Sequence, residues 1–145
     1  MKVRECMCNE VNWIKPEDSV SSCAKIMNEN HIGCVPVCDE SKNLVGLVTD
    51  RDIVLRSIAV DKDVNTTPVS EIMTSEICCC NPDMEISEIQ SIMAENQIRR
   101  IPVVENNKVV GILTLGDLAA NKNISNEGVS ITFENICNCD KKNAE

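Results

Sequence analysis

Aromatic side chains are nearly absent from this chain of 145 residues, which has one tryptophan, one phenylalanine and no tyrosine. Apolar residues nevertheless make up 43% of the chain. A hydrophobic core must therefore be built from isoleucine, valine, leucine, methionine and cysteine. A chain of this length can bury one sizeable core or two small related ones.

Basic residues are also scarce, because 14 lysines and arginines face 23 aspartates and glutamates, a net charge of −9. This balance argues against a nucleic-acid or anionic-membrane surface, since both need a concentrated basic face. Long apolar runs are missing as well, and none approaches the roughly 20 residues of a membrane helix. The first six residues contain no apolar segment of the signal-peptide kind. We therefore expect a cytoplasmic protein, in which thiols stay reduced.

An internal repeat organises the chain. An offset of 66 residues aligns positions 3–38 with 69–104, and 13 of these 36 positions are identical, where roughly two or three would match by chance. Beyond a polar turn at 39–43 the offset becomes 65, and it then pairs 45–49 with 110–114. The sequence predicts two repeats, at residues 1–66 and 67–123, followed by a tail at 124–145.

Each repeat predicts the order β-α-β-β-α. Short runs at 11–14 and 77–80 are expected to be opening strands, and each leads to a proline. An amphipathic helix follows, then two strands joined by a tight turn (34–38 and 44–49, or 101–105 and 108–114), then a second helix. Each sheet has one face to cover, so the two repeats are expected to pack sheet to sheet with pseudo-two-fold symmetry, a mixed α/β (α+β) fold.

A repeated G-h-h-T-x-x-D motif, where h is apolar, joins a strand to a helix at 46–52 and 111–117. Its Thr49 and Thr114 fall at the turn, and its Asp52 and Asp117 fall in the first helical turn. Such a pair can simply cap the helix. However, a carboxylate also suits a ribose diol, and the hydroxyl and free amides would suit a phosphate. Two equivalent copies favour a ligand site.

These features resemble a pair of CBS domains (a Bateman module), and the resemblance covers about residues 3–120. The quoted segments TDRDIVLRSI and RRIPVVENNKVVGILTLGDLA are similar to small bacterial proteins that consist of such a pair alone. The resemblance implies regulatory binding of adenosine-containing ligands (AMP, ADP, ATP or S-adenosylmethionine) in the cleft between the repeats. It also implies a homodimer, and a protein partner of unknown identity that reads the ligand-induced change.

The resemblance also implies which residues touch the ligand. Asp52 and Asp117 would hold the ribose, and Thr49 and Thr114 would contact phosphate or ribose. The adenine slot would be lined by residues beside the prolines and in the opening strands, namely Trp13, Ile14, Val35, Pro36, Cys79, Ile101 and Pro102. No cofactor is required for this role.

Arginine, present five times, supplies the positive charge that a polyanion would need in so acidic a chain. Arg51 lies inside the first motif, Arg56 follows one helical turn later, and Arg99 and Arg100 precede the strand at 101–105. Solvated surface arginines remain the alternative. The two sites are expected to be unequal, because Gly33 and Cys34 stand where the second repeat has Arg99 and Arg100.

Catalytic motifs are missing: no nucleophile elbow, Walker loop, GxGxxG or HExxH occurs. The single histidine, His31, aligns with Gln97 and is expected at the surface or at a helix cap. We expect no enzymatic activity.

Cysteine, by contrast, occurs ten times. A metal- or redox-responsive scaffold without a nucleotide is therefore the alternative function, with Cys6, Cys8, Cys137 and Cys139 as the candidate thiolates. In the triplet 78–80, strand alternation would turn Cys79 away from its neighbours, which argues against one metal site there. In the tail, Val129, Phe133 and Ile136 predict one face of an amphipathic helix, and residues 140–145 are expected to be frayed.

Overall fold

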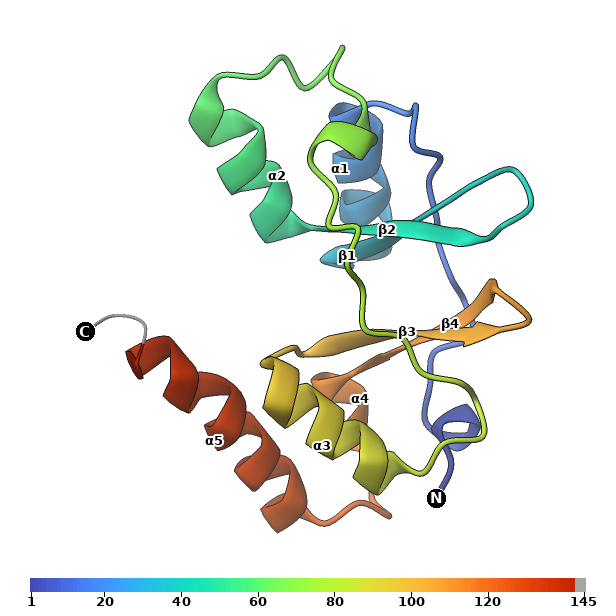
Figure 1. Ribbon diagram of the computed structural model, residues 1–145, viewed down its shortest axis with the longest axis vertical. Coiled ribbons are helices and arrows are strands. Elements are labelled where there is room, and N and C mark those ends of the chain that lie inside the picture. Colours follow the sequence, from blue (N-terminus) through green and yellow to red (C-terminus); the bar gives the residue numbers. More distant parts are fainter. Residues whose placement is uncertain (143–145) are drawn as a thin grey trace. The chain divides into compact units, whose positions relative to one another are not determined.

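The computed structural model of the protein describes residues 1–142, with side chains up to Cys137. The chain divides into two compact units (Figure 1). Unit 1 comprises Met1–Glu10, Cys78–Glu105 and Val110–Glu145, and unit 2 comprises Val11–Ile77 and Asn106–Val109. Each has its own hydrophobic core. The predicted mixture of helices and strands is confirmed.

From α1 onward, the helices and strands of unit 2 follow the predicted order. Strand β1 pairs antiparallel with β2, with Val35 opposite Val48 and a register shift at Val37/Cys38. The elements are α1 (Val20–Asn30), β1 (Cys34–Cys38), β2 (Leu44–Thr49), α2 (Asp50–Arg56) and two 3-10 turns, η2 (Ile58–Val60) and η3 (Val69–Glu71).

Unit 1 repeats this arrangement and adds a tail helix. Strand β3 pairs with β4 in a second two-stranded sheet. The elements are η1 (Val3–Glu5), α3 (Ile86–Asn96), β3 (Arg100–Glu105), β4 (Lys108–Thr114), α4 (Leu115–Ala120) and α5 (Asn126–Lys142).

The first helix of each repeat buries the face that its periodicity predicts. Helix α1 buries Val20, Cys23 and Met27. The equivalent helix α3 buries its residues Ile86, Ile89 and Met93. Both helices end at a non-glycine residue in the left-handed region, and its amide donates to a carbonyl four residues back; these residues are His31 (φ 53°) and Gln97 (φ 55°). The predicted cap role of His31 is confirmed.

The predicted opening strands at 11–14 and 77–80 are wrong. Each reduces to a single parallel bridge, from Ile14 to Val37 and from Cys80 to Val103. The amide of Ile14 donates to the Pro36 carbonyl (3.0 Å) and its carbonyl accepts from Cys38 (2.9 Å). The next bonds of the ladder would need amide hydrogens from Pro36 and Pro16, which proline lacks.

The same proline pair limits the second repeat. There the amide of Cys80 donates to the Pro102 carbonyl (3.0 Å), and the amide of Val104 donates to Cys80 (2.8 Å). Pro82 and Pro102 then end the ladder on both sides. The cysteine triplet therefore contributes one bridge residue, Cys80, to the sheet and does not form a strand.

The compact units cut across the sequence repeats, because each repeat's first segment packs with the body of the other repeat. In unit 1, the amide of Val3 donates to Met84 (3.0 Å), and Cys8 bridges Ile112. In unit 2 the equivalent amide of Val69 donates to Asp18 (2.8 Å). Correspondingly, Thr74 bridges Leu47. We call residues 1–8 and 69–74 the exchanged segments.

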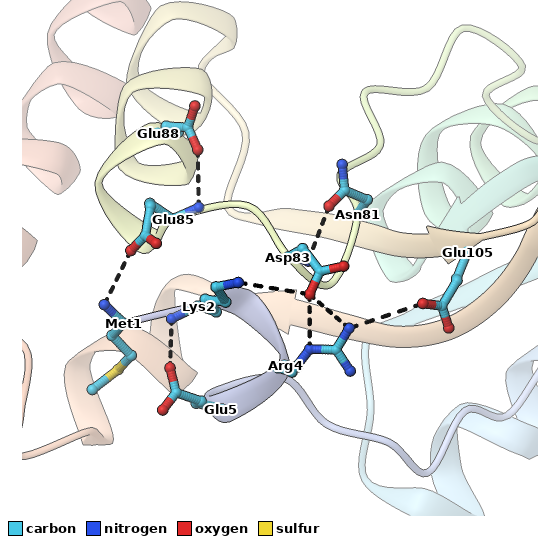
Figure 2. A network of polar contacts seen from close by, with 9 residues as sticks. All are labelled: Met1, Lys2, Arg4, Glu5, Asn81, Asp83, Glu85, Glu88 and Glu105. Atoms are coloured by element: carbon cyan, nitrogen blue, oxygen red, sulfur yellow. Dashed lines mark hydrogen bonds and ion pairs between the residues drawn. The ribbon is translucent and has the colours of Figure 1, made fainter.

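Ion pairs fasten the exchanged segment of unit 1 at its surface (Figure 2). The Arg4 guanidinium donates to Asp83 through Nη2 (2.8 Å) and Nε (3.1 Å). The terminal amine of Met1 pairs with Glu85 (3.1 Å). The hydrogen bond from Arg4 lowers the pKa of Asp83.

Helix α5 packs against α3 and α4 (Figure 1). Its buried residues include Ile136 and Thr132, and the Thr132 hydroxyl donates to the Gly128 carbonyl (2.8 Å) within the helix. The prediction for Phe133 is wrong, since its side chain is 45% exposed. Because the Thr132 hydroxyl already donates to an acceptor within the helix, its side chain can be buried where Phe133 was expected. Residues 140–142 belong to α5, so the fraying expected for them is wrong. The last three residues lie outside the described range.

Candidate functional site

The two G-h-h-T-x-x-D motifs form the same structure, a reciprocal cap at the start of α2 and of α4. In α2, the Thr49 hydroxyl accepts from the Asp52 amide (3.1 Å), and the Asp52 carboxylate accepts from the Thr49 amide (2.9 Å). In α4, the corresponding distances between Thr114 and Asp117 are 3.1 and 2.8 Å. The capping interpretation of these residues is thus correct for both copies.

This cap uses only one oxygen of each carboxylate, Oδ2. The Oδ1 atom of Asp52 lies 3.8 Å from Arg56 Nε, and the Asp52 side chain is 14% exposed. The Oδ1 atom of Asp117 has no hydrogen-bond partner among residues 1–137. Each aspartate therefore keeps one acceptor oxygen on a rigid, half-buried carboxylate.

The backbone amides at these helix starts are mostly occupied, contrary to the expectation of a phosphate cradle. The Asp50 amide donates to Gly33 (3.0 Å), and the equivalent Leu115 amide donates to Arg99 (2.8 Å). The amides of both motif aspartates serve the threonine hydroxyls. These starts can hold a diol through carboxylate oxygens better than a phosphate through amides.

The residues expected around the adenine ring divide into enclosed and accessible ones. Trp13 is partly exposed and Cys79 is exposed. The others are buried, with Val35 and Ile101 fully enclosed in the two cores. Because their side chains are buried, they present no exposed surface to a ligand. The enclosed residues are Ile14, Val35, Pro36, Ile101 and Pro102.

The arginines take different positions. Arg51 is exposed and its guanidinium has no partner in the described part of the chain. The guanidinium of Arg99 lies over the Phe133 ring, 6.0 Å from its centroid, a cation–π contact with α5. Arg100 is partly buried at the start of β3. Of the three, only Arg51 presents an uncommitted guanidinium.

Most cysteines pack as small apolar residues. Burial raises the thiol pKa to about 11 for Cys23 and Cys38 and to about 12 for Cys80. Cys8 is exposed, and Cys6 accepts a hydrogen bond from Asn121 Nδ2 (2.9 Å).

The candidate thiolates for zinc are only partly described. Within the described residues, no three cysteine, histidine, aspartate or glutamate side chains group closely enough to hold a metal ion. The side chain of Cys139 lies outside that range, so the predicted set with Cys6, Cys8 and Cys137 stays a prediction. Over the same residues, no helix is long and apolar enough to cross a membrane.

The model of the CBS-domain family matches residues 3–58 and 69–122, which include both motifs, residues 3–8 of the first exchanged segment and all of the second. The chain belongs to the CBS-domain family. The resemblance inferred from the sequence is confirmed.

Relatives cover nearly the whole chain. The CBS domain-containing protein YhcV of Bacillus subtilis is 40% identical over 134 residues, which are 92% of this chain and 94% of that protein. The crystal structure of Hypoxic Response Protein I, with two coordinated zinc ions, matches with a TM-score of 0.76 and 33% identity over 82% of this chain and 97% of that one.

A further solved structure holds adenosyl compounds. It is the CBS domain pair of the protein MJ0100 in complex with 5-methylthioadenosine and S-adenosyl-L-methionine. It matches with a TM-score of 0.74 and 28% identity, and covers 82% of this chain and 93% of that chain.

Two residues of this CBS pair stand beside the motif aspartates: Arg56, which the sequence indicated only as part of the positive charge near the motif, and Asn121, which was not predicted. The offset of 65 pairs Arg56 with Asn121, each four positions after its aspartate. Both side chains reach an exchanged segment: Arg56 donates to the Ile72 carbonyl (3.2 Å), and Asn121 donates to Cys6. Their i, i+4 spacing on a helix is the signal that could have identified them.

Proposed function

We propose that this CBS pair is a non-catalytic regulatory module that binds an adenosine-containing ligand. Asp52 and Asp117 would hold the ribose diol. The observation that carries the proposal is the pair of identical Thr–Asp caps, each of which fixes a carboxylate and leaves one of its oxygens to accept. A carboxylate held in this way is preorganised, so a diol that donates to it orders few groups on binding.

Support for the ligand class comes from the MJ0100 pair with its two adenosyl compounds. Binding regulates only if the ligand prefers one arrangement of the protein. The exchanged segments are the natural elements to respond, since Arg56 and Asn121 connect them to the helices that carry the aspartates. An unidentified cytoplasmic protein would read that change, without nucleic acid or membrane.

A metal-responsive role is the second candidate, favoured by the two zinc ions of the Hypoxic Response Protein I structure. Here Cys6, Cys8, Cys137 and Cys139 would supply the thiolates. This role needs no nucleotide, so the two candidates respond differently to the same titration.

We also propose a homodimer that uses an apolar patch on α2 and η2. Four large side chains there are about half exposed, although the equivalent positions of the second repeat are Ala119, Ala120, Asn123 and Ser125. Charged residues of both signs flank the patch in the sequence (Asp50 and Arg51 before it, Asp61 after it), so a two-fold-related copy could pair unlike charges across it. The patch consists of Val54, Leu55, Ile58 and Val60.

The test is thermal unfolding with AMP, ADP, ATP, S-adenosylmethionine, 5-methylthioadenosine or zinc at millimolar concentration. We expect at least one adenosyl compound to raise the melting temperature, since a ligand at 100 times its Kd adds about 2.7 kcal/mol of stability. A shift with zinc alone supports the metal-responsive role. No shift with any adenosyl compound refutes the nucleotide role.

For the dimer, Leu55→Lys should give a monomer in sedimentation, and an unchanged dimer refutes the patch.

A further inference from the structure

The duplicated caps differ in the residue that lies four positions after each aspartate. At Asp52 this residue is Arg56, whose Nε lies 3.8 Å from the Oδ1 atom left over by the cap. At Asp117 it is Asn121, whose amide group points to the Cys6 sulfur instead. The hydrogen bonds of the two Thr–Asp caps are the same, so the chain provides its own comparison. The two motifs also differ at their central positions, where Asp50 and Arg51 correspond to Leu115 and Gly116.

The Arg56 guanidinium is held in place by more than its aspartate. Its Nη1 atom donates to the Ile72 carbonyl (3.2 Å) and to the Thr74 hydroxyl (3.3 Å), both in the exchanged segment. To leave Asp52, Arg56 would have to give up these bonds or stretch them. The remaining oxygen of Asp52 is therefore shared with a fixed cation.

A ribose diol donates two hydrogen bonds to a carboxylate, so it competes with any other donor for the same oxygen. At Asp117 that oxygen has no competitor within the described residues. The electrostatic environment also differs, because an adjacent cation weakens a carboxylate as an acceptor toward a second, neutral donor.

We propose that Arg56 and Asn121 make the two adenosyl sites unequal, so that a ligand fills the Asp117 site first and the Asp52 site only in competition with Arg56. This inference rests on the proposed function. Arg56 acts here as a positioning residue: it holds Asp52 and touches no ligand. Because the Arg56 side chain is half exposed, solvent screens the ion pair and the effect is modest. A pair of this kind corresponds to about a two- to fivefold difference in Kd.

The experiment is calorimetric titration of the whole protein with adenosine, which is neutral and isolates the diol from phosphate effects. Asp117→Asn and Asp52→Asn keep an acceptor for the cap and assign each site. Reciprocal exchanges then test the positioning residues, with Arg56→Asn for the first repeat and Asn121→Arg for the second. Lys62→Asn is the matched control. This substitution removes one positive charge and an ion pair to Glu71, which lies in the same exchanged segment. Lys62 itself does not contact Asp52.

We expect Arg56→Asn to tighten the Asp52 site about two- to fivefold and Asn121→Arg to weaken the Asp117 site by a similar factor. Lys62→Asn should leave both affinities unchanged. High salt should tighten the Asp52 site of the unmodified protein and leave Asp117 unaffected, because salt screens the competing ion pair. A merely structural role for Arg56 would not produce this salt response.

Equal affinities at the two sites would overturn the inference, as would weaker binding at Asp52 after Arg56→Asn, which would make Arg56 a ligand contact. Either result leaves the proposed function standing. Absence of adenosine and S-adenosylmethionine binding in every variant refutes both. Thermal unfolding of each variant shows whether it is folded before its affinity is compared.

Discussion

Gly46 tests the packing of an exchanged segment against its unit. Its backbone does not adopt a positive φ, so alanine suits the conformation. A Cβ atom there would lie 2.3 Å from Met73 Sδ and 2.9 Å from Met73 Cγ. Overpacking of this kind costs about 1–3 kcal/mol, and the reduced entropy of the unfolded chain returns about 0.4–1 kcal/mol. Because the close atoms belong to the flexible end of a methionine, we expect Gly46→Ala to lower the free energy of unfolding by about 1 kcal/mol.

The assay is urea denaturation of the single variants and of Gly46→Ala/Met73→Ala, followed by circular dichroism. Met73→Ala removes the two close atoms and leaves Met73 Cβ at 3.3 Å. The double variant should therefore be more stable than the sum of the single effects by about 1 kcal/mol. Additivity within about 0.3 kcal/mol would refute the contact, and with it the exchanged arrangement of residues 69–74.

The equivalent glycine, Gly111, should respond differently to the same treatment. A Cβ atom there would meet Met7 Sδ at 2.7 Å and also the Cys8 carbonyl oxygen at 2.9 Å. The oxygen belongs to the backbone bridge between Cys8 and Ile112, so truncation of Met7 cannot relieve it. We expect Met7→Ala to rescue Gly111→Ala less than Met73→Ala rescues its counterpart.

Two further predictions concern unit 1. Ile136→Ala should cost about 2–4 kcal/mol in urea unfolding, because its side chain is 2% exposed, whereas Phe133→Ala should cost about 0.5–1 kcal/mol through the lost contact with Arg99. Equal costs would contradict the observed face of α5. Because Arg4 lowers the pKa of Asp83, this ion pair contributes stability above pH of about 4 and loses it as pH falls through the folded value. The melting-temperature difference between the unmodified protein and Asp83→Asn should shrink over that acid range; a constant difference would show that the pair does not contribute.

The repeat and its helices and strands could be predicted from the sequence because they depend on local patterns. Apolar runs on both sides of a polar turn predicted β2 with both ends correct, and helical periodicity predicted the buried faces of α1 and α3. The sequence predicted a strand at 11–14, where the structure has only a single bridge at Ile14. Its limiting feature, the missing amide hydrogens of Pro16 and Pro36, becomes visible only once the pairing partner is known.

The exchanged segments could not be predicted in the same way. An offset identifies Val3 and Val69 as equivalent, but it does not say with which copy each packs. The Thr–Asp motifs were located correctly, and both uses of them, cap and ligand site, were open from the sequence. The hydrogen bonds of Arg56 to Ile72 and Thr74 join positions that are more than a dozen residues apart. They could therefore be found only from the structure.

The central claim is that the motif aspartates bind an adenosyl ligand, and calorimetric titration with S-adenosylmethionine tests it most directly. The protein, Asp52→Asn and Asp117→Asn are compared, since asparagine keeps one oxygen for the cap and replaces the second carboxylate oxygen with an amide nitrogen, which cannot accept from the diol. We predict saturable binding to the unmodified protein, with each substitution weakening its own site. No binding, or full binding in both variants, would contradict the account.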